Sequence, residues 1–385
     1  MMNFTFYNPT RIHFGEGQIS KIGKEIPKDA KVLLIYGGGS IKSNGIYEQV
    51  KDALSNHEWS EFSGIEPNPK YSTAMQAIEI IKDKNIDYLL AVGGGSVIDA
   101  VKFIAAAALF KGDDPWDMLV KQTKVEQAID FGVVLTLPAT GSESNSGSVM
   151  TRDGNKLFFG SPLVYPTFAI LDPSVTLSLS DRQISNGVID AFVHTVEQYL
   201  TYPVNAKIQD RFAEGILQTL IEDGPLALNE ETKGNLEVRA NLMWSATMAL
   251  NGLIGLGVPQ DWATHMIGHE LTALHGIDHA RTLSIVYPAV LKMCKTAKRE
   301  KLIQYGKRVW NLTNQDEQQL INQAIAKTEE FFRTMQVPTR LSDVDLTNSD
   351  IDPILSKLKQ HRMVMLGEHQ DIDLNKSREI LTIAL

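Results

Sequence analysis

The chain of 385 residues is long enough for two domains, and its composition, 43% hydrophobic and 22% charged, is that of a folded globular protein. Its formal charge of −9 disfavours nucleic acid and anionic membranes as partners, because proteins that bind phosphate backbones concentrate lysine and arginine. The start has no basic segment followed by an apolar run, and the longest apolar stretch, around 103–110, is too short to span a bilayer. We therefore expect a cytoplasmic protein with no membrane partner.

The first half of the chain alternates short apolar runs with helical patterns. The runs at 31–36, 87–92 and 132–137 are rich in Val, Leu and Ile without polar alternation, which is typical of parallel strands covered on both faces. Segments 40–54 and 71–84, between these runs, have the spacing of helices. This order predicts an open α/β sheet.

Two of the predicted strands end in the same sequence of three glycines and a serine. In open α/β sheets, ligands bind beyond the carboxyl ends of the strands, where helix N-termini and backbone N–H groups attract anions. Glycine lets the backbone approach a phosphate closely, so both loops fit a pyrophosphate, although a tight connection without a ligand is the alternative for either loop alone. Neither loop has the third glycine of the dinucleotide fingerprint, which disfavours a common Rossmann dehydrogenase. The candidate cofactor residues are Gly37, Gly38, Gly39 and Ser40 in the first loop and Gly93, Gly94, Gly95 and Ser96 in the second.

A third polar segment, residues 137–148, follows the strand predicted at 132–137 and adds small hydroxyl side chains at the same edge of the sheet. Its place makes Thr136, Thr140 and Ser142 candidates for cofactor contact, with a simple hydrophilic loop as the alternative.

Beyond about residue 175 the strand signal fades, and the chain reads as helices. The segment 171–181 combines a proline after a strand with several serines and threonines, and Ser180 or Asp181 is a plausible helix N-cap. We therefore predict an α/β dinucleotide-binding domain over 1–175 and an all-helical metal-binding and substrate domain over 176–385. The predicted helices of the second domain include 182–200, 208–222, 238–250 and 261–274.

Histidines cluster in the helical half. Asp190 and His194 are four positions apart on one predicted helix, as are His265 and His269 on another, so each pair projects from one face. Gly276 should end the second helix and place His279 on the following turn. Since Cys294 is the only cysteine, a thiolate site is excluded, and imidazole and carboxylate ligands suit Zn²⁺ or Fe²⁺. The spacing alone does not choose among these histidines.

These segments resemble the iron-containing, or group III, alcohol dehydrogenases over the whole chain. The residues that carry the resemblance are GGGSVIDAVK, TLPATGSE, NGVIDAFVHTVEQY and VPQDWATHMIGHELTALHGIDHA. They are most similar to NADPH-dependent aldehyde reductases and butanol dehydrogenases. The resemblance implies a dehydroquinate synthase-like fold, in which a Rossmann-like amino-terminal domain precedes an all-α metal-binding domain, and family habit suggests a homodimer joined through the amino-terminal segment NFTFY.

The resemblance also implies site residues. It assigns Asp190, His194, His265 and His279 as ligands of one divalent metal, Fe²⁺ or Zn²⁺, and leaves His269 near the site. It places the pyrophosphate at Gly93 to Ser96 and Asp99 close to cofactor and substrate. The residues implied to line the rest of the cofactor site are Thr136, Thr140, Ser142 and Lys156.

Relatives that prefer NAD carry an aspartate in the first glycine loop, where this chain has Gly39, Ser40, Ile41 and Lys42. With no carboxylate in the loop to repel a 2′-phosphate and a cation nearby, NADP(H) is the expected cofactor. Lys42 as a solvated helix residue is the alternative.

The expected activity is hydride transfer between NADP(H) and small aldehydes or primary alcohols, with the metal as Lewis acid and His269 as the proton relay. A dehydroquinate synthase-like lyase is the alternative. It would need a lysine and arginine cluster to hold an anionic sugar phosphate, and the segments 190–199 and 261–271 supply few cations. A binding module without turnover is a second alternative.

Overall fold

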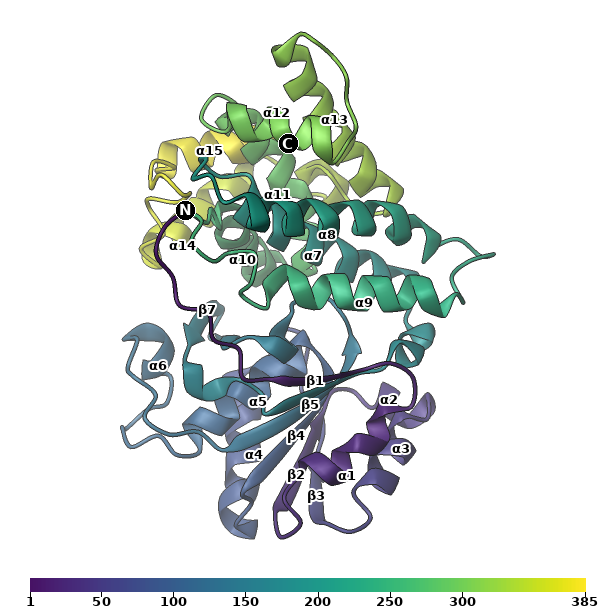
Figure 1. Ribbon diagram of the computed structural model, residues 1–385. Coiled ribbons are helices and arrows are strands. Elements are labelled where there is room, and N and C mark those ends of the chain that lie inside the picture. The colour runs from purple at the N-terminus through teal and green to yellow at the C-terminus, as the bar shows by residue number, and fades with distance from the viewer. The chain divides into compact units, whose positions relative to one another are not determined.

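The computed structural model describes residues 1–385, which form two compact units (Figure 1). An α/β unit comprises Tyr7–Leu179 and Asn235–Thr247, and a helical unit comprises Met1–Phe6, Ser180–Gly234 and Met248–Leu385. The predicted fold class, a Rossmann-like parallel sheet with an all-α carboxy-terminal part, is confirmed. The predicted boundary at residue 175 stays a prediction.

The α/β unit is built on one six-stranded parallel sheet with strand order β1-β8-β5-β4-β2-β3. The runs predicted as buried strands are β2, β4 and β5, three neighbouring interior strands of this sheet, and a separate antiparallel hairpin, β6-β7, follows β5 along the chain. The strands are β1 (Arg11–Phe14), β2 (Lys31–Tyr36), β3 (Glu58–Phe62), β4 (Tyr88–Gly94), β5 (Asp130–Leu137), β6 (Gly147–Arg152), β7 (Asn155–Gly160) and β8 (Phe168–Leu171).

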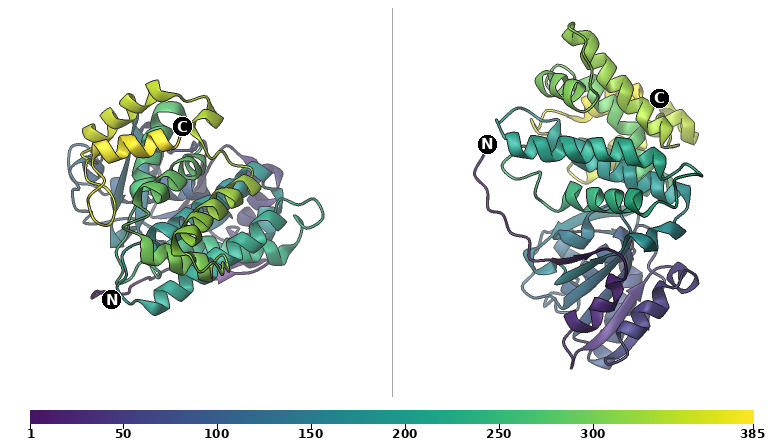
Figure 2. Two further views of the ribbon diagram at one scale, coloured as in Figure 1. Left: turned by 90° about the horizontal axis from the view of Figure 1, so that it is seen from above. Right: turned by 45° about the vertical axis from the view of Figure 1, so that its right-hand side comes forward.

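Helices cover both faces of this sheet, as the apolar runs predict (Figures 1 and 2). On β2, Leu33 and Ile35 pack toward one face, whereas Val32 and Leu34 belong to the core of the other. This alternation follows from the two-residue period of a strand. The predicted helix 40–54 forms two helices instead of one, because Gly45 interrupts it with a φ of 81°. The helices of the unit are α1 (Ile22–Glu25), α2 (Ser40–Ser43), α3 (Ile46–Ala53), α4 (Tyr71–Lys84), α5 (Gly95–Ala107) and α6 (Asp117–Val120).

The strand register brings the three polar loops to one edge of the sheet. Tyr36, at the end of β2, pairs with Val92 of β4, and Gly94 of β4 pairs with Leu137 at the end of β5. The two glycine loops and the segment after β5 therefore begin side by side at the carboxyl edge, where the sequence predicts the cofactor.

The helical unit has no strands. Its first helix begins at the predicted N-cap: the Ser180 hydroxyl accepts from the backbone N–H of Gln183, whose side chain accepts from the Ser180 N–H in return. The helices are α7 (Asp181–Tyr199), α8 (Lys207–Leu226), α9 (Leu236–Leu250, of which Leu236–Thr247 groups with the α/β unit), α10 (Ala263–His275), α11 (His279–Cys294), α12 (Arg299–Arg308), α13 (Glu317–Thr334), α14 (Ile351–Gln360) and α15 (Leu374–Ile383). Helix α11 packs on α7, α10, α13 and α15.

None of these helices combines the length and the apolar character that crossing a membrane would require.

Candidate metal and cofactor sites

Three helices of the helical unit carry the predicted metal ligands. Asp190 and His194 lie one turn apart on α7, and His265 lies on α10. Gly276 ends α10 in the left-handed conformation, with a φ of 68°, and His279 is the first residue of α11. The helix ending predicted at Gly276 is therefore confirmed.

The structure brings three of these side chains into one group. Ligand atoms of Asp190, His265 and His279 all lie within 4.8 Å of one another. His194 is not part of this three-residue group, but its ring stacks on that of His265 with a centroid distance of 4.5 Å, and its Nδ1 is 3.8 Å from Oδ1 of Asp190. Asp190 Oδ1 is also 3.8 Å from Nε2 of His279.

The chemistry of this group fits a divalent metal ion. Oδ1 of Asp190 and Nδ1 of His194 are buried and have no hydrogen-bond partner, although buried polar atoms are nearly always hydrogen-bonded. Burial lowers the pKa of the His194 imidazole to about 4, so this ring is neutral at neutral pH and offers a lone pair. Imidazole and carboxylate together suit Zn²⁺ or Fe²⁺.

His269, predicted as a residue near the site, is buried on α10 beside the group. Its ring centroid is 4.9 Å from that of His279 and 6.3 Å from that of His265. It does not belong to the three-residue group. His269 is therefore placed where a side chain could exchange a proton with a molecule held at the ligands.

Two further residues, Glu197 and Trp262, lie at this group, and the spacing of the histidines did not reveal Glu197. Glu197 is fully buried on α7, and its carboxyl contacts Nδ1 of His265. Trp262 precedes α10 in the left-handed conformation, with a φ of 62°, and its ring lies 5.3 Å from that of His265. A bulky residue at positive φ is strained, and such strain is concentrated at functional sites.

In the α/β unit, the second glycine loop forms a close-packed cradle. A Cβ on Gly93 would lie 2.5 Å from Val97, and one on Gly95 would lie 2.6 Å from Thr140, so a side chain at either position would collide with its neighbours. Gly95 and Ser96 begin α5, whose N-terminal N–H groups and dipole favour an anion. The backbone therefore supports the predicted pyrophosphate position.

Asp99 and Ser142, both predicted near the cofactor, hydrogen-bond to each other. The Ser142 hydroxyl donates to Asp99 Oδ1 at 2.6 Å, and the other carboxylate oxygen accepts from the N–H of Val149 at 3.0 Å. Lys102, fully buried, donates to the Ser142 hydroxyl, Asn145 Oδ1 and the Gly147 carbonyl at 2.8 Å each. Burial lowers the pKa of Lys102 to about 8. These contacts fasten α5 to the loop after β5, a role of Lys102 that the sequence did not show.

The first glycine loop is more open. Gly39 adopts a φ of 96°, and no atom lies within 4 Å of where its Cβ would be. Lys42 Nζ lies 3.4 Å from Oε1 of Glu61 on β3 and 4.7 Å from the centroid of the Tyr47 ring. The loop itself contains no carboxylate. The fold nevertheless brings the carboxylate of Glu61 to Lys42, 19 positions away along the chain.

The remaining predicted cofactor residues lie around the same sheet edge. Thr136 is on β5, and the Thr140 hydroxyl accepts from the N–H of Ser142 at 3.2 Å. Lys156, on β7, is buried and donates to Oδ1 of Asn68 at 2.9 Å.

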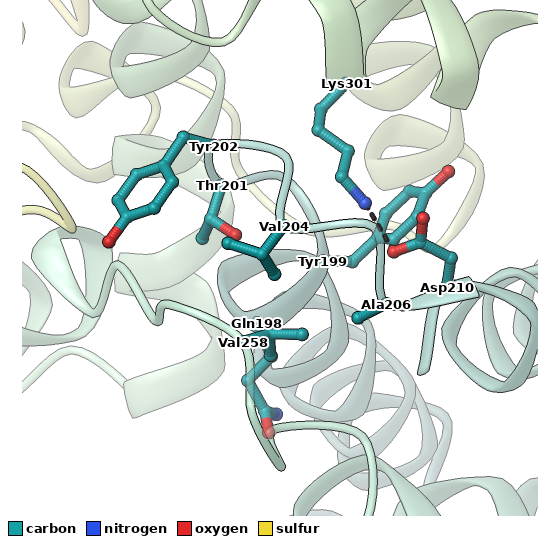
Figure 3. A pocket seen from close by; sticks show the side chains of 9 residues that line it. All are labelled: Gln198, Tyr199, Thr201, Tyr202, Val204, Ala206, Asp210, Val258 and Lys301. Atoms are coloured by element: carbon teal, nitrogen blue, oxygen red, sulfur yellow. Dashed lines mark hydrogen bonds and ion pairs between the residues drawn. The ribbon is translucent and has the colours of Figure 1, made fainter. Parts of the chain in front are cut away.

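A separate small pocket lies in the helical unit, between the end of α7 and α12 (Figure 3). Its volume of about 10 Å³ has room for roughly one water molecule. Lys301 points across it to Asp210, and the two form an ion pair. The pocket is too small for an aldehyde, and we assign no ligand to it.

Comparison with known proteins places this geometry in a family. The model of the iron-containing alcohol dehydrogenase matches residues 9–173, and that of the carboxy-terminal domain of Fe-containing alcohol dehydrogenases matches residues 184–381. The chain is 56% identical to the NADPH-dependent aldehyde reductase YqhD of Escherichia coli, with both proteins covered completely. It is 36% identical to the NADH-dependent butanol dehydrogenase A of Clostridium acetobutylicum, with 99% of each covered.

Solved structures agree with these matches. The crystal structure of the E. coli protein superimposes with a TM-score of 0.98 over 100% of this chain and 99% of that one, at 56% identity. The NADH-dependent butanol dehydrogenase A of Thermotoga maritima gives a TM-score of 0.95 at 37% identity, over 100% of this chain and 99% of the other. The full-length matches favour an alcohol dehydrogenase over the lyase alternative, and the chain belongs to the iron-containing alcohol dehydrogenase family.

Proposed function

We propose that this protein is a metal-dependent alcohol dehydrogenase that works as an aldehyde reductase, transferring hydride between NADP(H) and short- to medium-chain aldehydes or primary alcohols. The observation that carries the proposal is the group of Asp190, His265 and His279, whose ligand atoms lie within 4.8 Å of one another in a chain of this family. The name of the E. coli relative, an NADPH-dependent aldehyde reductase, supports the choice of cofactor and substrate.

The proposed roles follow from the contacts. Asp190, His265 and His279, together with His194, would hold one Fe²⁺ or Zn²⁺. When bound, the metal supplies a Lewis acid that polarises a carbonyl, and the nicotinamide supplies the hydride. His269 would deliver the proton to the product oxygen.

Residues of the α/β unit would bind the cofactor. The start of α5 would hold the pyrophosphate through backbone N–H groups, and the Asp99–Ser142 pair, fastened by Lys102, would keep the neighbouring loop in place. The other residues proposed to contact NADP(H) are Gly37, Gly38, Gly39, Ser40, Lys42, Gly93, Gly94, Thr136, Thr140 and Lys156.

Steady-state reduction of butanal tests the function. Chain stripped of metal and reloaded separately with zinc and with ferrous iron is assayed with NADPH and with NADH. We expect turnover that depends on the metal and favours NADPH. Turnover that favours NADH would retain the enzyme and contradict the cofactor assignment, whereas no turnover with either metal would contradict the function.

The relay is tested by replacing His269 with alanine. We expect the turnover number to fall by about 10²-fold, at the lower end of the effect of general acid–base groups, while bound metal stays at the wild-type amount. Metal content is measured by mass spectrometry on the same samples as the kinetics. Parallel loss of metal and turnover would make His269 a ligand and refute the relay.

The division at residue 175 into cofactor-binding and metal-binding parts, a cytoplasmic location and a homodimer are further parts of the proposal. The aromatic side chains of Phe4, Phe6 and Tyr7 are all exposed, which supports a contact between chains through the amino-terminal segment. Sedimentation equilibrium tests the proposed homodimer, because it measures the mass of the protein in solution.

A further inference from the structure

A second carboxyl group lies behind the proposed metal ligands. Glu197 is on α7, three positions after His194, and its side chain is completely buried. One of its oxygens, Oε2, contacts Nδ1 of His265, and the other, Oε1, accepts from the backbone N–H of Thr264 at 2.7 Å. Both oxygens of this carboxyl are therefore used by two consecutive residues of α10.

We propose that Glu197 is a positioning residue that fixes the tautomer and the ring orientation of His265 and thereby sets the affinity for the metal. The proposal rests on the ligand set given under the proposed function. A carboxyl oxygen at Nδ1 keeps the ring proton on that nitrogen, so the lone pair is on Nε2. A partner of this kind makes an imidazole a better ligand and prevents the ring from turning.

Glu197 and the start of α10 are held against each other by a second set of buried contacts. The carbonyl of Glu197 accepts from the N–H of Asp261 at 2.9 Å, and Oδ1 of Asp261 accepts from the N–H of Ala263 at 3.0 Å. The other oxygen of Asp261 forms an ion pair with buried Lys298 at 2.8 Å. Lys298 in turn bonds to Glu368 at 2.6 Å.

These contacts explain a strained backbone conformation just before α10. Trp262 has a φ of 62°, a conformation that a bulky residue adopts only when its surroundings enforce it. Asp261 on one side is bonded through its backbone and both carboxylate oxygens, and Thr264 on the other side is bonded to Glu197. The turn is therefore held by hydrogen bonds on both sides of Trp262. His265 follows Thr264 directly, so its position relative to α7 is restricted.

The variant Glu197→Gln tests the proposal in the full-length chain. An amide has one acceptor oxygen and one donor group, so it cannot accept from both Thr264 and His265. Zinc affinity is measured by competition with a chromophoric chelator, and the ligand field by the visible spectrum after loading with Co²⁺. We expect zinc to bind about 10- to 100-fold more weakly and the Co²⁺ bands to shift, while the metal-free protein keeps its cooperative unfolding.

Glu270→Gln is the matched control. Glu270 is also buried, lies on α10, and bonds to a histidine ring nitrogen, Nδ1 of His361 at 2.6 Å, but that histidine is outside the ligand set. We expect its zinc affinity to stay within about twofold of wild type. Wild-type affinity and spectrum in Glu197→Gln, or equal loss in both variants, would overturn the proposal.

A measurement on the unsubstituted chain covers the case in which Glu197→Gln does not fold. In zinc-loaded wild-type protein, long-range proton–nitrogen correlation NMR should show the ring proton of His265 on Nδ1. A proton on Nε2 would refute the role of Glu197 while leaving the metal site intact. Absence of zinc binding by the wild type would instead refute the ligand set, and the proposal with it.

Discussion

Replacing Asp190 with asparagine is expected to remove the bound metal and to lower kcat/KM for butanal at least ~10³-fold, the rate equivalent of several kcal/mol of transition-state stabilisation. Asp190 is the only carboxylate of the three-residue group, and its Oδ1 lies 3.8 Å from ring nitrogens of both His194 and His279. Asparagine keeps the size of the side chain but removes the charge that attracts a dication. Bound metal per chain and steady-state kinetics are measured on the same preparations.

Unfolding adds a second readout for this variant. A ligand that binds only the folded state, at a free concentration a thousandfold above its Kd, stabilises it by about 4 kcal/mol, so zinc should raise the melting temperature of the wild type. We expect no such rise for Asp190→Asn. Metal-free Asp190→Asn should be at least as stable as the metal-free wild type, because the substitution removes a buried charge whose Oδ1 has no hydrogen bond.

His275→Ala is the control for Asp190→Asn. His275 ends α10 and is partly exposed, and it lies outside the three-residue group. The His275→Ala variant should keep both the bound metal and the activity. Full metal occupancy in Asp190→Asn would contradict the proposed ligand set.

Replacing Gly39 with aspartate is expected to reverse the cofactor preference. A carboxylate in this loop can accept hydrogen bonds from the ribose hydroxyls of NADH, whereas it repels the 2′-phosphate of NADPH. Like charges brought together in a binding site cost several kcal/mol, and about 2.8 kcal/mol corresponds to a 10²-fold change. We therefore expect kcat/KM for NADPH to fall by about 10²-fold and that for NADH to hold or rise.

Gly39→Ala separates charge from backbone strain. Gly39 has a φ of 96° and open space at its Cβ, so either substitution fits sterically but adopts an unfavourable backbone conformation. The two variants share this strain, and only the aspartate adds the charge. The ratio of kcat/KM for NADPH to that for NADH should change in Gly39→Asp alone. Equal loss with both cofactors in both variants would show that the effect comes from strain.

Local signals in the sequence were sufficient for much of the fold. The apolar run at 31–36 is β2 with the predicted bounds, Ser180 caps α7, and Gly276 ends α10. Each of these features depends only on residues within one strand or one helical turn. The strand needs apolar side chains on both faces, the N-cap needs a hydroxyl three positions before a free N–H, and the helix end needs a residue that tolerates positive φ. The prediction of one continuous helix over 40–54 was wrong at Gly45. Glycine adopts positive φ without a steric penalty, and it interrupts the helix there despite the helical spacing of the apolar residues.

The composition and spacing also determined which chemistry this protein can carry: a single cysteine excluded a thiolate site, and clustered histidines with Asp190 indicated an imidazole and carboxylate site. Only the tertiary structure decided how these side chains are supported. Glu197 meets His265 across 68 positions, Lys102 meets Asn145 across 43, and Glu61 meets Lys42 across 19. Such pairs carry no sequence period, because the partners come from different helices and strands and meet only when apolar burial has packed those elements together.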